Sequence, residues 1–229
     1  MKSLFYILLI IILGCDSNLL SDSKIIPYEN EFQKKIMTAT HLRLKEKVIY
    51  KPDYFIIDYP MGDIPDGFGV CTDVVIRSYR TVGVDFQELV HNDIKKSINS
   101  YPLMEIWGQK NPDTNIDHRR VPNLEVFFKR NAESFSPSLN SNDYKPGDIV
   151  TWDLPGGSPW HIGIVSNHLN SNGIPLIIHN IGRGPVMTDI LFSFNIRGHY
   201  RYDYLKNLIY LISIIFLLKI SEGVSILTK

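Results

Sequence analysis

One cysteine and two histidines are the residues of this chain whose types and spacing could support nucleophilic chemistry. Cys71 is one of two cysteines, and the other, Cys15, ends an apolar N-terminal run that is typical of export. A lone thiol in an exported domain has no internal disulfide partner, so Cys71 is an inert buried residue, an intermolecular bridge or a nucleophile. A Gly-rich loop precedes it, and Cys71–Thr81 follows a helical pattern that ends at Gly83. Because a helix N-terminus favours the thiolate, the pattern favours the nucleophile and predicts a lowered thiol pKa.

His161 and His179 are the candidate base and its orienting partner. Both lie in segments of two-residue periodicity that are expected to be neighbouring antiparallel strands. A hairpin with Val165 opposite Pro175 would place the two histidines directly opposite each other, with Cβ atoms about 5 Å apart. One ring could then take a proton from Cys71 while the other orients it, as in a thiol-protease triad.

A zinc site is the competing chemistry for these three side chains, because one cysteine and two histidines can supply three ligands. The chain has no CxxC pair and no HExxH, and a cysteine at a loop–helix junction suits a nucleophile better. We therefore expect no metal and no cofactor. The histidines without such a context are expected on the surface or in the core: His41, His91, His168 and His199.

The polar loop 111–120 ends in two adjacent arginines, which suit recognition of carboxylates. The alternative is a structural loop in which Asp117 pairs with those arginines, and the sequence leaves both interpretations open. The candidate substrate contacts are polar or aromatic residues of this loop and of the segments beside the proposed nucleophile and base: Asp73, His118, Arg119, Arg120 and Trp160.

The elements that must position these residues fall into a helical first half and a strand-rich second half, which predicts an α+β fold with helices packed on an antiparallel sheet. The helical patterns cover 28–47, 71–81, 85–102 and 121–130, and Asp85 with Glu88 has the spacing of a capping box. The strand patterns cover 148–154, 161–166 and 175–180, and 53–58 is expected to be a strand or an extended segment.

The two ends of the chain differ from this central domain. Residues 1–15 resemble a signal peptide that ends in a lipobox, with Cys15 as the lipidated residue; an ordinary cleaved signal or an uncleaved anchor are the alternatives. Residues 16–25 are expected to be a tether and 26–203 one globular domain. The extension 204–229 contains an apolar run of about 11 residues, short of the roughly 20 that span a bilayer. It could lie in a membrane interface, pack on the domain or be an appendage without catalytic function.

The charge balance argues against nucleic-acid binding. Lys+Arg and Asp+Glu are both 24, which gives a net charge of +0. We expect a monomer held at the membrane by its lipid and exported to the periplasmic face of a bacterial membrane, or secreted.

Several runs of the sequence resemble the bacterial DUF1287 family. They are Cys71–Arg80, Asn115–Leu124, Pro146–Trp152, His161–Ser166, Ile178–Gly182 and Gly198–Tyr202. That family looks like a distant relative of the NlpC/P60 papain-like cysteine peptidases, in which a cysteine opens a helix, a histidine begins a strand and a third polar residue lies on the next strand. Carried across by motif, the resemblance implies Cys71, His161 and His179 as catalytic residues and peptides of the bacterial cell wall as substrates.

The leading interpretation is thus a cell-envelope thiol hydrolase that cleaves peptidoglycan peptide bonds. Two alternatives stay open from the residues alone. One is a non-catalytic envelope lipoprotein that binds wall fragments or a partner enzyme. The other is a Cys-dependent acyltransferase.

Overall fold

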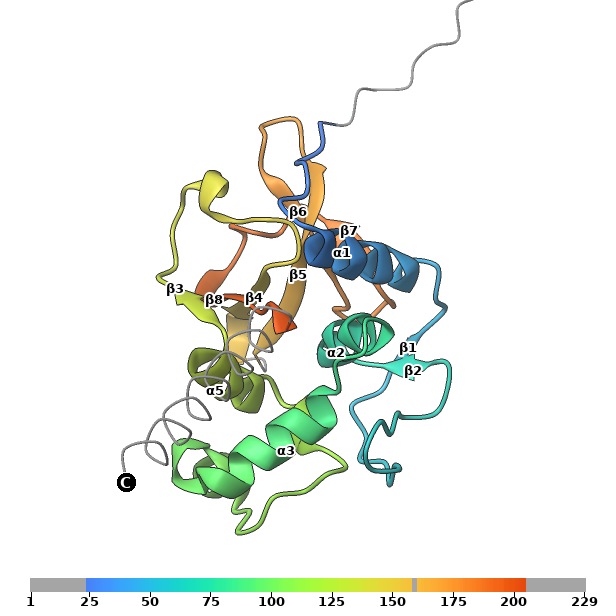
Figure 1. Ribbon diagram of the computed structural model, residues 1–229, viewed down its shortest axis with the longest axis vertical. Coiled ribbons are helices and arrows are strands. Elements are labelled where there is room, and N and C mark those ends of the chain that lie inside the picture. The colour runs from blue at the N-terminus through green and yellow to red at the C-terminus, as the bar shows by residue number, and fades with distance from the viewer. Residues whose placement is uncertain (1–23, 158–159, 205–229) are drawn as a thin grey trace, which may run out of the picture.

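A computed structural model describes residues 24–157 and 160–204 of the chain (Figure 1). The signal segment 1–15, the lipidation residue Cys15, most of the tether and the extension after Tyr204 lie outside the described residues. In the described part of the chain, no helix is both long and apolar enough to cross a membrane.

A six-stranded sheet occupies the C-terminal half, with the order β3-β8-β4-β5-β6-β7 and antiparallel pairing between all neighbours. The strands are β3 (Glu133–Phe135), β4 (Ile149–Asp153), β5 (His161–Leu169), β6 (Pro175–His179), β7 (Val186–Thr188) and β8 (Asn195–Arg201). A separate two-residue ladder joins β1 (Ile49–Tyr50) to β2 (Phe68–Gly69) in parallel.

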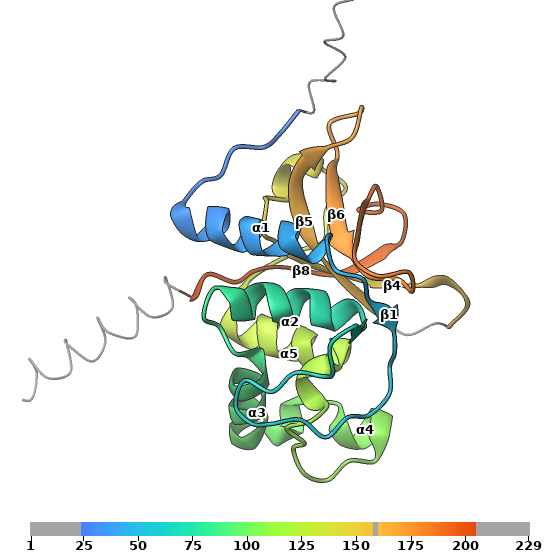
Figure 2. The same ribbon diagram turned by 90° about the vertical axis from the view of Figure 1, so that its right-hand side faces the viewer.

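Helices precede this sheet in the chain: α1 (Glu31–Arg43), α2 (Cys71–Thr81), α3 (Phe86–Lys96), α4 (Leu103–Trp107) and α5 (Val121–Asn131). Figure 2 shows α2 lying between α1 and α3, and α2 also packs against β5. Because it is enclosed from several sides, α2 buries most of its residues and not one stripe alone, as expected of a central helix. The predicted α+β class with an antiparallel sheet is confirmed.

Both faces of the central strands are covered, so β4 and β5 are buried almost throughout. Ile162, Ile164 and Ile178 pack into the core that contains α2 and α5. Val165, Ile177 and Trp152 alternate with them and form a second, smaller core with Tyr144, Val150 and Leu191. Strand residues of opposite parity therefore serve two different cores.

Several expected boundaries are wrong for local reasons. The first helix starts at Glu31, because the Asn30 side chain caps it by accepting a hydrogen bond from the Gln33 N–H at 2.8 Å. The third helix stops at Lys96 and does not continue to residue 102. Asp85 caps that helix through the Gln87 N–H at 2.9 Å. Of the two outcomes expected for residues 53–58, a strand or an extended segment, the structure has no strand there.

Candidate active site

Cys71 occupies the first position of helix α2, as predicted. Val70 is the N-cap residue with extended backbone angles, and its N–H donates to the Asp73 carboxylate at 2.7 Å. This bond fixes the start of the helix immediately after β2. Cys71 is 5 % exposed and belongs to the core that α2 shares with β5.

The thiol lies at the place where the ladder between β5 and β6 ends. The last pair of that ladder joins Gly163 to His179, so Ile162 is one residue beyond it. The Ile162 N–H is hydrogen-bonded to the Cys71 sulfur. The proposed nucleophile therefore sits beside β5, next to the residue that follows His161.

Tyr50 is a second partner of the thiol, and the sequence reasoning missed it. Burial raises the pKa of the Tyr50 hydroxyl, and the charge of Cys71 and a hydrogen bond from the hydroxyl to the Cys71 sulfur add to this. The parallel ladder pairs Tyr50 with Gly69, two residues before Cys71, and so holds the phenol against the helix start. A ladder of two residues leaves no periodicity in the sequence, so no pattern could have revealed this contact.

His161 and His179 form a hydrogen bond of 2.9 Å between Nε2 of His161 and Nδ1 of His179. The predicted register is wrong, because Leu169 and not Val165 lies opposite Pro175, with an irregularity between Val165 and Leu169. Gly163 is consequently the residue directly opposite His179. A shift of two residues keeps every side chain on its predicted face, so the two rings still meet diagonally across the strands.

Gly163 makes this diagonal contact possible. A Cβ atom at position 163 would come within 2.7 Å of Ile177 Cγ2 and 3.0 Å of the His179 Cβ. With no side chain there, the His161 ring can cross the vacant position and reach His179. The two ring centroids lie 5.0 Å apart with the planes nearly perpendicular, at 84°.

A chain of hydrogen bonds links the pair to Thr188 and couples the tautomers of the two rings. Nε2 of His179 bonds to the Thr188 hydroxyl at 2.7 Å. If His179 donates through Nε2, its Nδ1 accepts the Nε2–H of His161, which leaves Nδ1 of His161 as the basic nitrogen. Thr188, on β7, is a further residue that the sequence reasoning missed.

Both imidazoles are held neutral. Burial, with a smaller effect of His179, lowers the pKa of His161 to about 3, and burial lowers the pKa of His179 to about 4. The Trp152 ring, 5.9 Å from the His161 ring, contributes to this burial from β4. Neutral rings are the form in which one nitrogen donates and the other accepts.

The expectation of a lowered thiol pKa is wrong. Burial raises the pKa of the Cys71 thiol to about 11, and the nearby Asp73 carboxylate adds to this. The hydrogen bonds from Ile162, Thr72 and Tyr50 act in the opposite direction but are weaker. In the resting state the Cys71 thiol and both imidazoles are therefore neutral, and no thiolate–imidazolium pair forms among them.

The structure separates the candidate substrate contacts into two groups. Asp73 and Arg119 form a buried ion pair with two hydrogen bonds, of 3.0 and 3.1 Å, and His118 is 2 % exposed. Burial lowers the pKa of His118 to about 3, so it too is a neutral core residue. Arg120 and Trp160 line the cavity that contains Cys71, and the buried Arg119 also borders it.

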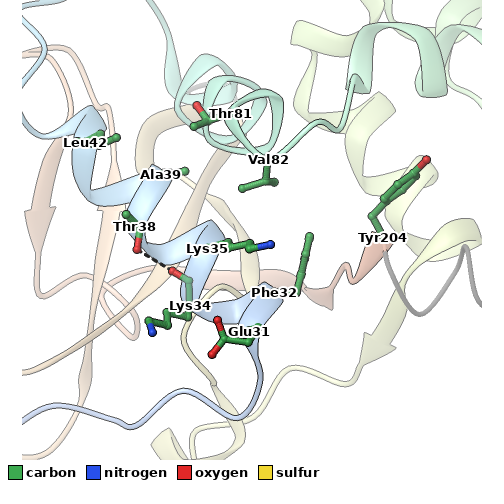
Figure 3. A pocket seen from close by; sticks show the side chains of 10 residues that line it. All are labelled: Glu31, Phe32, Lys34, Lys35, Thr38, Ala39, Leu42, Thr81, Val82 and Tyr204. Carbon is green, nitrogen blue, oxygen red and sulfur yellow. Dashed lines mark hydrogen bonds between the residues drawn. The ribbon is translucent and has the colours of Figure 1, made fainter.

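That cavity has a volume of about 440 Å³. It opens between the helix start and the loop 111–120. Aliphatic and proline side chains form part of its wall, and the aromatic and basic residues in it are Tyr50, Tyr54, Trp107, Trp160, Arg119 and Arg120. A larger cavity of about 530 Å³ lies between α1 and the end of α2, next to Tyr204 (Figure 3). Its walls hold no cysteine or histidine, so it offers no comparable chemistry.

No cluster of three or more His, Cys, Asp and Glu side chains within residues 24–157 and 160–204 is arranged to hold a metal ion. The remaining buried histidine, His199, bonds to the Asp148 carboxylate at 2.7 Å and stacks on Tyr144. His199 therefore belongs to the core, which is one of the two places, surface or core, expected for it.

The chain is 47% identical over 167 residues to the Uncharacterized protein YijF of Escherichia coli (strain K12), across 73% of this chain and 80% of that protein. Two crystal structures of an N-acetylmuramoyl-L-alanine amidase from Bacteroides uniformis ATCC 8492 cover 76% of this chain and 100% of theirs at 15% identity, with TM-scores of 0.43 and 0.41. At these scores the structural likeness carries no information about function.

Residues 37–202 match the family described as Domain of unknown function (DUF1287), and this range includes the thiol and both histidines of the site. Together with the identity to the E. coli relative, the match covers the whole described sheet and the helices α2 to α5. The chain belongs to the DUF1287 family.

Proposed function

We propose that this protein is a thiol hydrolase in which Cys71 attacks an amide carbonyl, His161 transfers the proton and His179 orients His161. The observation that carries the proposal is the 2.9 Å hydrogen bond between the two histidines, on the strand whose next residue, Ile162, bonds to the thiol. A nucleophile, a base and a group that orients the base are the three parts of such a site.

The chemical steps follow from the neutral resting state. The Cys71 thiol gives its proton to Nδ1 of His161 as the sulfur bonds to the carbonyl carbon. His161 then protonates the leaving amine, the C–N bond breaks and a thioester remains on Cys71. Water attacks the thioester, His161 takes a proton from it, and the released sulfur recovers its own proton.

Proton transfer within this pair creates both charges together. Each group alone is hard to ionise, because it would carry a charge in a buried place. When the proton passes from sulfur to imidazole, the two opposite charges form side by side and their attraction offsets part of that cost. Activation therefore takes place during the attack and does not need a standing thiolate.

In this proposal two donors stabilise the oxyanion. The N–H groups of the first turn of a helix have no partner within the helix, so the Cys71 N–H is available to a negative oxygen near its own sulfur. The Tyr50 hydroxyl, already directed at the sulfur, can turn to the same oxygen. We assign Tyr50 a supporting role in this step.

The substrate and location are part of the proposal. We place the enzyme in the cell envelope, because residues 1–15 resemble a lipoprotein signal. Peptides of the bacterial cell wall are the amide substrates accessible there. The likeness to NlpC/P60 peptidases, in motif order, supports the same choice.

The test is digestion of purified peptidoglycan by the full chain, with mass analysis of the released fragments. We expect new amine and carboxyl ends with the wild type and none with Cys71→Ala or His161→Ala. His179→Ala should retain more activity than His161→Ala, because His179 orients and does not receive the thiol proton. Fragments that are bound and not cut, or cut equally by Cys71→Ala, would exclude the thiol mechanism. Fragments that appear joined to an added amine would indicate acyl transfer.

A further inference from the structure

The two adjacent arginines of the loop 111–120 are bound in different ways. All three guanidinium nitrogens of Arg119 donate inside the protein: Nε and Nη2 to the Asp73 carboxylate, and Nη1 to the Asp53 carbonyl at 3.2 Å. Its side chain is 2% exposed, as expected of a buried ion pair that holds helix α2 to the loop. Each of the three guanidinium nitrogens of Arg119 is thus engaged inside the protein.

Arg120 makes its hydrogen bonds with one of its three guanidinium nitrogens. Its hydrogen bonds within the described chain are made by Nη1, to Gln109 Oε1 at 2.5 Å and to Asp117 Oδ1 at 3.3 Å. The guanidinium carbon lies 4.0 Å from the centre of the Trp107 ring, so the plane of the group rests on an aromatic face. Stacking and the buried Asp117 side chain together fix the orientation, and Nε and Nη2 are left as a two-donor fork.

This fork belongs to the cavity of the proposed nucleophile. Arg120, Trp107 and Cys71 all line the same space of about 440 Å³. The residues of its wall include two arginines and no aspartate or glutamate. Burial of Arg120 lowers its pKa, which reflects the cost of keeping a cation where water is partly excluded. A bound anion would offset that cost.

We propose that Arg120, and not Arg119, binds a free carboxylate of the substrate, so that the enzyme selects peptides that carry a carboxylate close to the scissile amide. The proposal rests on the proposed function for its reacting bond, and it adds the chemical class of the substrate. A planar carboxylate matches the two parallel N–H donors of the fork, whereas a neutral amide can accept only one of them. Trp160 and Tyr54 would pack against the apolar part of the same peptide.

The experiment compares two synthetic cell-wall stem peptides that differ only in one group, a free carboxylate in one and a carboxamide in the other. For the wild-type full chain we expect kcat/KM to be at least tenfold higher for the acid, since a charge-assisted pair outweighs a neutral one by that order. Arg120→Gln should lower kcat/KM for the acid to the value of the amide and leave the amide unchanged. Arg120→Lys should restore only part of the preference, because lysine keeps the charge and loses the fork.

The control and the binding arm keep the two proposals distinguishable. Arg130→Gln removes a surface arginine paired with Asp93 and should leave the preference intact. Binding of both peptides to Cys71→Ala by calorimetry tests recognition without any cleavage. Equal kcat/KM and equal binding of acid and amide by the wild type would overturn the carboxylate site while leaving the thiol hydrolase standing. If the wild type binds the acid selectively but cleaves neither peptide, the thiol hydrolase is overturned and the carboxylate site stands.

Discussion

Gly163→Ala is the substitution that tests most sharply how the histidine pair is held. The added Cβ would meet Ile177 Cγ2 at 2.7 Å, the His179 Cβ at 3.0 Å and the Ile178 carbonyl oxygen at 3.1 Å. Carbon atoms in contact prefer separations of about 3.5–4.0 Å, so β6 must move away from β5 by roughly 0.5–1 Å. Two of the three close atoms belong to the backbone or to a Cβ, and rotation of a side chain cannot relieve them.

The size of the effect follows from that displacement. Forcing one methyl group into a packed site typically costs about 1–3 kcal/mol of stability. The same movement lengthens the 2.9 Å bond between His161 and His179 beyond the range of a hydrogen bond. Because a misplacement of about 1 Å in a catalytic group can cost on the order of 100-fold in rate, kcat should fall by about 10- to 100-fold.

The assay is a double-mutant cycle with His179→Ala, in which both hydrolysis and unfolding by denaturant are measured. If Gly163 acts on the rate through the position of His179, the double variant should be no slower than His179→Ala alone. The stability cost should persist in the double variant, since alanine at 179 retains the Cβ. Multiplicative losses of rate, or a Gly163→Ala variant as active as the wild type, would refute the reasoning.

Four further outcomes follow from the structure. Alkylation of Cys71 by iodoacetamide should rise about tenfold per pH unit between pH 7 and 10, because burial raises the thiol pKa to about 11; a plateau that extends to pH 6 would contradict this. Tyr50→Phe should lower kcat by more than it changes KM, since the lost hydroxyl acts on the sulfur and the oxyanion; an unchanged kcat would remove Tyr50 from the mechanism. His118 is neutral in the folded protein, with a pKa of about 3 against an ordinary 6.5, so below pH 6.5 the unfolded chain binds one proton more and stability falls as the pH drops. His118→Gln should reduce the slope of the unfolding free energy against pH in that range, and an unchanged slope would contradict the burial of His118. Metabolic labelling with a fatty-acid analogue should mark the wild type and not Cys15→Ser, and equal labelling of both would rule out the lipid.

The sequence predicts the parts of the site that depend on local pattern. Cys71 begins a helix because a Gly-rich loop gives way to helical periodicity there, and α2 has the predicted bounds. His161 and His179 share a face because strand residues alternate, and an error of two residues in the register preserves that face. A register error of one residue would have separated the rings.

What the sequence does not predict depends on contacts between distant segments. Tyr50 reaches the thiol through a ladder of two residues, and Thr188 reaches His179 from the next strand. The raised pKa of Cys71 reflects how completely the core closes over the first turn of α2, which no local motif records. Likewise, the sequence does not show that Arg119 and not Arg120 forms the buried ion pair with Asp73.

The central claim is that Cys71 becomes acylated by the substrate with His161 as its base, and trapping the acyl-enzyme tests it most directly. The full chain is mixed with a synthetic wall-stem peptide, quenched in acid within milliseconds to seconds, digested and mapped by mass spectrometry. We predict a hydroxylamine-sensitive peptide adduct on the fragment that contains Cys71, formed much more slowly in His161→Ala and absent in Cys71→Ser. Cleavage of the peptide without any adduct on Cys71, or an adduct that forms equally fast in His161→Ala, would contradict the account.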